Sequence, residues 1–220
     1  MINVLIACEE SQSECSAFLR HGCNAYSCDL QPCSGRYPGR HIVGDVRSMF
    51  VPGSIVHTSD GMPLAIPKWH LIIAHPPCTY LTKAASHLLF AGHQLNAERY
   101  KLGVDAAQFF FEMLNAPAPY VAVENPVPCK IFGLPRSSFA FDPCDFGAPW
   151  RKRTWLWLRN LPPLIASIES AKKKSWVRCT RGGKKRSKSF DCVSESMAAQ
   201  WVPFILQDMN RNQLLKHGTI

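Results

Sequence analysis

The chain has 220 residues, 46% of them apolar, which is enough to bury one sizeable hydrophobic core. No apolar run approaches the ~20 residues of a membrane span, and the first apolar stretch, Ile2–Cys8, is too short and too closely followed by acids to be a signal peptide. Ten cysteines without a Cys-x-x-Cys pair favour reduced thiols over a disulfide framework or a zinc site. We therefore expect a cytoplasmic protein with no membrane segment and no metal.

The net charge of +9 is concentrated in one segment, residues 172–188, which contains no acid. Such a basic block attracts polyanions, above all nucleic acid, with an affinity that falls as salt rises. A solvated basic loop without a specific partner is the alternative. The cations of this block are Lys172, Lys173, Lys174, Arg178, Arg181, Lys184, Lys185, Arg186 and Lys188.

The first thirty residues predict a strand, a helix and a second strand. Ile2–Ala7 is the first strand, Ser13–Arg20 is a helix that ends before Gly22, and Asn24–Cys28 is a second strand that ends at Asp29. An acid about twenty residues after the first turn is the arrangement with which a Rossmann-like sheet binds a ribose. A turn residue without function is the alternative for this acid.

The next segments supply a third strand and a long helix. His41–Val43 is a short strand, and Asp45 follows it as a second carboxylate at a strand end. Residues 51–68 are rich in Pro and Gly and are predicted to form a loop without function. Ala97–Leu114 carries apolar residues at helical spacing, which predicts a core helix.

A short apolar run, Leu71–Ala74, is closed by two prolines and a cysteine. Such a run is typical of a parallel strand that is buried on both faces. Pro76 and Pro77 fix their own φ angles and favour extended backbone before them, so Cys78 is predicted on a stiff turn at the carboxyl end of the strand. Open α/β sheets bind ligands at that edge. A buried structural thiol is the alternative.

A second buried run, Tyr120–Val123, ends in Glu124, Asn125 and Pro126. If the two strands are neighbours in the sheet, Cys78 and Glu124 lie close together. A later strand, residues 154–158, follows Arg151, Lys152 and Arg153, and an amphipathic helix is predicted over residues 195–209.

A thiol and a carboxylate beside a nucleoside pocket suit chemistry at carbon 5 of a pyrimidine. A thiolate that adds to carbon 6 makes carbon 5 nucleophilic, and a carboxyl group that hydrogen-bonds the ring nitrogen N3 stabilises the adduct. The thiolate requires a nearby cation or helix N-terminus, and the cations at residues 151–153 are candidates.

The order of these motifs resembles the DNA (cytosine-5) methyltransferases, with Pro-Pro-Cys and Glu-Asn-Pro as the most specific pair. The resemblance covers roughly residues 2–160 and the closing helix. It implies a Rossmann-like, S-adenosylmethionine-dependent methyltransferase fold with a mostly parallel central sheet and helices on both faces. It also implies three segments: a catalytic core (1–160), a basic and reduced target-recognition segment (161–192) and a C-terminal helix that returns to the core (193–220).

The resemblance assigns roles to individual residues. Cys78 would attack carbon 6 of a cytosine flipped out of DNA, Glu124 would hydrogen-bond or protonate N3, and S-adenosylmethionine would donate the methyl group. Arg151 and Arg153 would join the catalytic pair. Asp29 would bind the cofactor ribose and Asp45 would lie near its adenine amine. The implied cofactor residues are Cys8, Glu9, Ser11, Gln12, Asp29, Leu30, Asp45, Val46 and Pro76. The implied substrate contacts are Pro77, Thr79, Thr82, Asn125, Pro126, Lys152, Lys184, Lys185 and Arg186.

The chain departs from the family at three places. The turn after the first strand, residues 8–12, lacks the glycine-rich sequence of the family. Counting from Gly147 puts Lys152, not an arginine, on the catalytic face of its strand, and Arg151 and Arg153 fit only after a one-residue shift to the other face. About thirty residues stand where the family has a recognition domain, which predicts a short target sequence or a recognition partner.

Three functions are compatible with these residues. The leading hypothesis is methylation of cytosine in DNA at carbon 5. The second is the same chemistry on RNA, on a nucleotide or with another one-carbon group. The third is a catalytically idle nucleic-acid-binding protein, which the glycine-poor turn favours and the intact Cys78 and Glu124 oppose.

Overall fold

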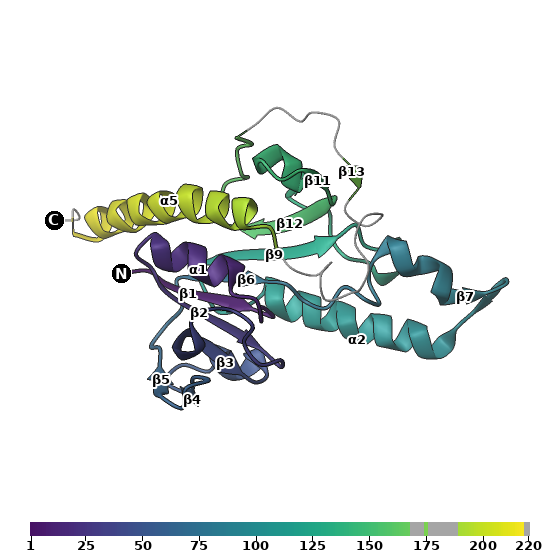
Figure 1. The fold of residues 1–220 in the computed structure, drawn as a ribbon, viewed down its shortest axis with the longest axis horizontal. Coiled ribbons are helices and arrows are strands. Elements are labelled where there is room, and N and C mark those ends of the chain that lie inside the picture. The colour runs from purple at the N-terminus through teal and green to yellow at the C-terminus, as the bar shows by residue number, and fades with distance from the viewer. Residues whose placement is uncertain (168–173, 176–188, 218–220) are drawn as a thin grey trace.

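The computed structural model describes residues 1–167, 174–175 and 189–217, and these residues form a sheet of seven strands between helices (Figure 1). The strands lie in the order β10-β12-β9-β6-β1-β2-β3. Their bounds are β1 Asn3–Ala7, β2 Asn24–Asp29, β3 His41–Val43, β6 Leu71–Ala74, β9 Tyr120–Pro126, β10 Phe139–Phe141 and β12 Thr154–Arg159.

The sheet is mostly parallel and has Rossmann-like order. Strands β3, β2, β1, β6 and β9 pair in parallel, and numbered by chain position they follow the order 3-2-1-4-5 of a doubly wound sheet. Strand β12 pairs antiparallel with β9, and β10 pairs antiparallel with β12. The predicted Rossmann-like fold with a mostly parallel central sheet is confirmed.

Helices cover both faces of the sheet, as predicted (Figure 1). Helices α1 (Ser13–Arg20) and α5 (Asp191–His217) share one hydrophobic core with the side chains of one face of the sheet. This core includes Trp201 of α5 and Ile73 of β6. Helix α2 (Ala97–Leu114) packs against the other face. Because both faces are covered, the central strands β1 and β6 are almost entirely buried, which explains their continuous apolar sequences.

Most predicted elements are present, but several bounds differ: β9 continues past the predicted Val123 to Pro126, and β10 was not predicted. Residues 51–68, predicted to form a loop, include an antiparallel hairpin of β4 (Ile55–His57) and β5 (Pro63–Ala65). The closing helix is longer than the predicted 195–209. Further short pairs are β7 (Phe90–Ala91) with β8 (Gln94–Leu95) and β11 (Trp150–Arg151) with β13 (Lys174–Ser175). The 3-10 helices are η1 Pro38–Arg40, η2 Val46–Phe50, η3 Lys83–Leu89, η4 Lys130–Phe132 and η5 Pro143–Phe146.

None of the helices in the described part of the chain combines the length and the apolar character needed to cross a membrane. The cysteines in that part are free thiols.

Candidate active site

The carboxyl ends of the five parallel strands meet at one edge of the sheet. At or near each of these ends lies a residue singled out from the sequence. Cys8 follows β1, Asp29 ends β2, Asp45 lies two residues after β3, Cys78 lies four residues after β6, and Glu124 lies within β9 beside its end. This edge is where open α/β sheets bind their ligands.

The Cys78 loop is tied to the loop that follows Glu124. The Asn125 side-chain amide donates to the Pro76 carbonyl over 3.4 Å, and the backbone N–H of Cys129 donates to the Leu81 carbonyl over 2.6 Å. Asn125 and Pro76 are buried, whereas Cys78 is only half-buried. The two motifs are therefore joined by hydrogen bonds, with the half-buried Cys78 in the loop between them.

Glu124 lies among groups that stabilise its charge. Its Oε2 is 3.3 Å from Nδ1 of His75, and Lys152 and the Thr154 hydroxyl lie nearby. Burial raises the pKa of Glu124, but His75, Lys152 and Thr154 together outweigh burial, so the pKa is lowered. Glu124 is therefore a carboxylate at neutral pH.

The Cys78 thiol is held in its neutral form. Burial raises its pKa, the neighbouring charge of Glu124 raises it further, and Lys152 opposes both. Thiol, carboxylate and lysine are thus close enough to interact electrostatically, and the reactive thiolate forms only when its surroundings change.

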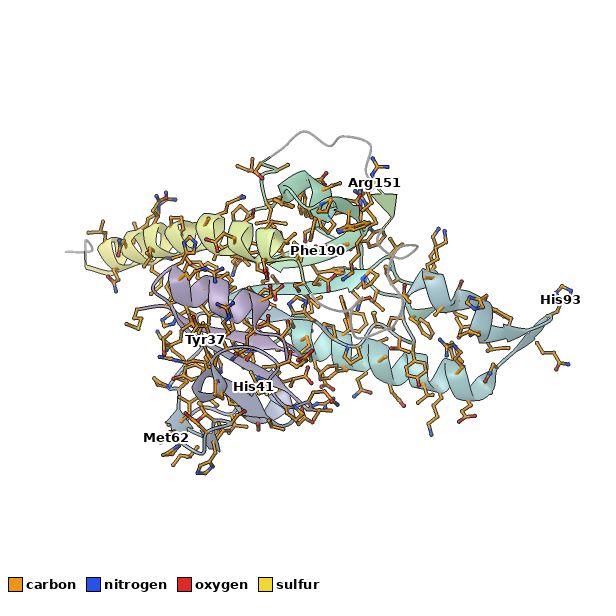
Figure 2. All side chains as sticks on the ribbon, viewed as in Figure 1. Tyr37, His41, Met62, His93, Arg151 and Phe190 are labelled. Atoms are coloured by element: carbon orange, nitrogen blue, oxygen red, sulfur yellow. The ribbon has the colours of Figure 1, made fainter. Side chains whose placement is uncertain are left out.

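His75 connects Glu124 to a second buried acid. Its Nε2 lies 3.4 Å from Oε1 of Glu14, in the first turn of α1. Burial lowers the pKa of His75, but Glu14 and Glu124 outweigh burial and raise it. A cavity of about 20 Å³ adjoins these groups, and Phe190 (labelled in Figure 2) and Lys152 are among its lining residues. That volume suffices for one water molecule.

Sequence reasoning missed His75 and Glu14. His75 directly precedes the Pro-Pro-Cys turn, and this adjacency is the one signal that marks it. Glu14 has the appearance of an ordinary acid in the first turn of a helix. Only the packing of α1 against the sheet brings it to His75.

Arg151 and Arg153, expected as catalytic cations, do not face Glu124. Arg151 is exposed at the periphery (Figure 2), and Arg153 forms an ion pair with Asp142 at 3.4 Å. Lys152, between β11 and β12, and Thr154, at the start of β12, line the same small cavity as Glu124. The cation beside Glu124 is therefore Lys152, and catalytic roles for Arg151 and Arg153 stay predictions.

The turn between β1 and α1 has the backbone shape that glycines favour, although it contains none. Cys8 has φ 61° and Gln12 has φ 60°, both in the left-handed region. Gln12 is fully buried, and its side chain accepts from the Tyr37 backbone N–H and donates to the Tyr37 carbonyl, both over 2.9 Å. Those hydrogen bonds fix the turn in place of glycine. The neighbouring Ser11 is half-buried.

Glu9 points inward and caps α1. Its carboxyl oxygens accept from the backbone N–H groups of Glu14 and Cys15 over 2.8 and 3.3 Å. Burial and the adjacent Glu14 raise the pKa of Glu9 well above its usual range. Burial and the adjacent Glu14 thus favour the neutral form of Glu9.

The Asp29 and Asp45 carboxylates lie at the ends of neighbouring strands, close to Cys8. Burial of Cys8, together with the charges of Asp29 and Asp45, raises the pKa of its thiol to about 12. Asp29 accepts from the Gln31 backbone N–H over 2.8 Å. Asp45 forms an ion pair with Arg47 at 3.0 Å. Beside these acids, Leu30 is 72% exposed, while Val46 is buried.

The remaining predicted substrate contacts divide by location. Pro77 and Thr79 are exposed beside Cys78, and Pro126 is half-buried after Asn125. Thr82 caps η3 by accepting from the Ala84 backbone N–H. Lys184, Lys185 and Arg186 lie outside the described residues.

Comparisons with known proteins found no matching family model and no curated relative. Among solved structures, the chain is similar to a crystal structure of a candidate DNA modification methyltransferase encoded within an *E. coli* prophage, with 13% identity and a TM-score of 0.38. The match covers 72% of this chain and 46% of that one, so the chain spans less than half of that protein's length. A similarity of this size does not support an inference about function. The fold assignment rests on the strand order.

Proposed function

We propose that the chain transfers a methyl group from S-adenosylmethionine to carbon 5 of cytosine in DNA. The observation that carries the proposal is the placement of Cys78, Glu124 and Lys152 at one end of two adjacent parallel strands, close enough for the charges of Glu124 and Lys152 to act on the pKa of the Cys78 thiol. A nucleophilic thiol, an N3 partner and a cation for the thiolate are what carbon-5 chemistry requires.

Each residue has a defined part in the reaction. The Cys78 thiolate adds to carbon 6 of a cytosine held outside the helix stack, and the ring electrons move toward N3, which takes up a proton delivered through Glu124. Carbon 5 then takes the methyl group. Loss of the carbon-5 proton to solvent expels Cys78 as thiolate, and N3 returns its proton to Glu124, which restores the neutral aromatic base. Lys152 stabilises the thiolate before attack and after expulsion.

The residues at the other end of the same edge fit the cofactor. Asp29 would accept the ribose hydroxyls, the exposed Leu30 offers an apolar surface to a purine ring, and Asp45 would accept the adenine amine. The left-handed Cys8 and Gln12 allow the chain to turn sharply beside the ligand. The bound cofactor would supply an electrophilic methyl group.

The proposal is tested by trapping the adduct on DNA that contains 5-fluorocytosine. Fluorine cannot leave carbon 5 as a proton does, so the parent protein with S-adenosylmethionine should form a stable covalent complex. Cys78→Ser should form none. Cys129→Ser, which alters a half-buried thiol in the adjoining loop, should still form the complex. No adduct with the parent, or an adduct with Cys78→Ser, would refute the proposal.

A further inference from the structure

We propose that His75 is a positioning residue that donates a proton through Glu124 to N3 of the target base, with Glu14 holding the imidazolium in place. This inference rests on the proposed function. It adds to Cys78 and Glu124 a buried pair of residues that the sequence motifs do not include.

The His75 imidazole is hydrogen-bonded to Glu124 on one side and lies within ion-pair distance of Glu14 on the other. Nδ1 of His75 lies 3.3 Å from Oε2 of Glu124, and Nε2 lies 3.4 Å from Oε1 of Glu14. The imidazole is thus held between two carboxylates, one on β9 and one on α1. The Glu14 side chain is 1% exposed and that of His75 is 13% exposed, so water screens these contacts little.

The charges around His75 favour its protonated form. Glu14 and Glu124 face it from two elements, while Lys152 opposes them from the chain before β12. Glu9 lies behind Glu14, and burial together with Glu14 raises its pKa, which favours its neutral form. Cys78 is on the loop of His75 and is a neutral thiol at rest.

The chemistry needs such a donor because Glu124 is ionised. A carboxylate has no proton to give to N3, and its lone pairs repel the lone pair on that nitrogen. As Cys78 bonds to carbon 6, a proton passes from His75 Nδ1 to the Glu124 carboxylate, and Glu124 then passes this proton on to N3. His75 becomes neutral and keeps its Nε2 proton toward Glu14. When Cys78 leaves, N3 returns the proton along the same path, so no oxidant or further reactant is consumed.

The first test needs no activity. Titration of the imidazole ¹⁵N signals, with the signal of His75 identified by its loss in His75→Asn, should show a midpoint above the ordinary value of 6.5. Glu14→Gln keeps the size of the side chain but removes its charge, and it should lower that midpoint. A midpoint at or below 6.5 in the parent, or one that Glu14→Gln leaves unchanged, would overturn the inference.

The second test follows the rate of adduct formation on 5-fluorocytosine DNA against pH. Because the reaction needs a thiolate and an imidazolium, the parent rate should rise with pH up to the pKa of His75 and then level off. Glu14→Gln should move that inflection to lower pH. His75→Asn should abolish it and reduce the rate at pH 7 roughly 100-fold.

A matched control is His70→Asn, which alters a buried histidine at the opposite end of β6. It should leave the inflection in place even if it lowers the melting temperature. An adduct with the parent and an unchanged inflection in His75→Asn would contradict the relay alone. No adduct with the parent would contradict the proposed function, and the relay with it.

Discussion

Glu124 and Lys152 act on the Cys78 thiol in opposite directions. The carboxylate raises the pKa of the thiol and the lysine lowers it, while burial sets a high starting point. This balance describes a nucleophile that stays protonated until a substrate alters its surroundings. A bound cytosine whose N3 interacts with Glu124 would weaken the effect of this carboxylate on the pKa of the Cys78 thiol. Binding of the base would thereby favour formation of the thiolate.

Alkylation of Cys78 by iodoacetamide measures this balance. Glu124→Gln removes the carboxylate charge, so the pKa of Cys78 should fall and alkylation at pH 8 should be severalfold faster than in the parent. Lys152→Gln should make it severalfold slower. Mass spectrometry of the Cys78 peptide gives the rates, and the buried Cys28 serves as an internal reference. Equal rates in all three proteins would show that the thiol does not sense these charges.

At the level of single residues, the sequence identified the residues of the two motifs but not the residues that contact them. Cys78 and Glu124 were predictable because proline-bounded strand ends are visible locally. The pairing of His75 with Glu14 joins positions 61 residues apart through the docking of α1, and no local pattern records it. The choice between Lys152 and its flanking arginines depended on strand register, where a shift of one residue exchanges the two faces.

Helix α2 packs closely against the 3-10 helix η4 at Gly103. Gly103 lies in the interior of this helix, where alanine normally stabilises by about 1 kcal/mol. Here an added Cβ would overlap the Phe132 ring of η4. The glycine allows α2 to approach the segment that follows the Glu124 loop.

Gly103→Ala should therefore destabilise the fold by about 1–3 kcal/mol, against the usual helix preference. Urea unfolding followed by circular dichroism gives the free energy of unfolding. Val104→Ala, at the next and exposed position, should change it by less than about 0.5 kcal/mol. Stabilisation by Gly103→Ala would show that Phe132 moves aside without cost.

The elements that the sequence predicted best are those buried on both faces. Strands β1, β6 and β9 are nearly continuous apolar runs, and α2 carries a clear helical repeat. The hairpin of β4 and β5 was missed because its strands have three residues each and alternate between exposed and half-buried positions. So short a pattern resembles a loop.

Across the whole molecule, α5 belongs structurally with the N-terminal half. Ser13 on α1 donates to Asp191 over 2.6 Å, and Arg20 and His21 both form ion pairs with Glu195. The chain thus leaves the sheet after β12 and returns to cover α1. The division into a core (1–160), a basic recognition segment (161–192) and a returning helix (193–220) stays a prediction.

The basic segment is predicted to bind DNA phosphates. Neutralising Lys184, Lys185 and Arg186 together with Gln should weaken binding to all sequences alike. It should also flatten the slope of log affinity against log salt by about 2 to 3, because each phosphate contact contributes about 0.9. Fluorescence anisotropy at several salt concentrations measures both effects.

A matched control replaces three exposed cations elsewhere, Lys68, Lys101 and Arg211, with Gln. The same loss of charge should then change the slope far less. Equal slopes for the two triple variants would show that net charge, and not the basic segment, governs binding. A changed sequence preference would show that the segment reads bases.

The central claim is that carbon 5 of cytosine in DNA receives the methyl group. It is tested most directly by digesting DNA to nucleosides after incubation with the protein and isotope-labelled S-adenosylmethionine, followed by mass spectrometry. The account predicts label in 5-methyldeoxycytidine with the parent protein and none with Cys78→Ser. Label in N4-methyldeoxycytidine or N6-methyldeoxyadenosine, or label that survives Cys78→Ser, would contradict it.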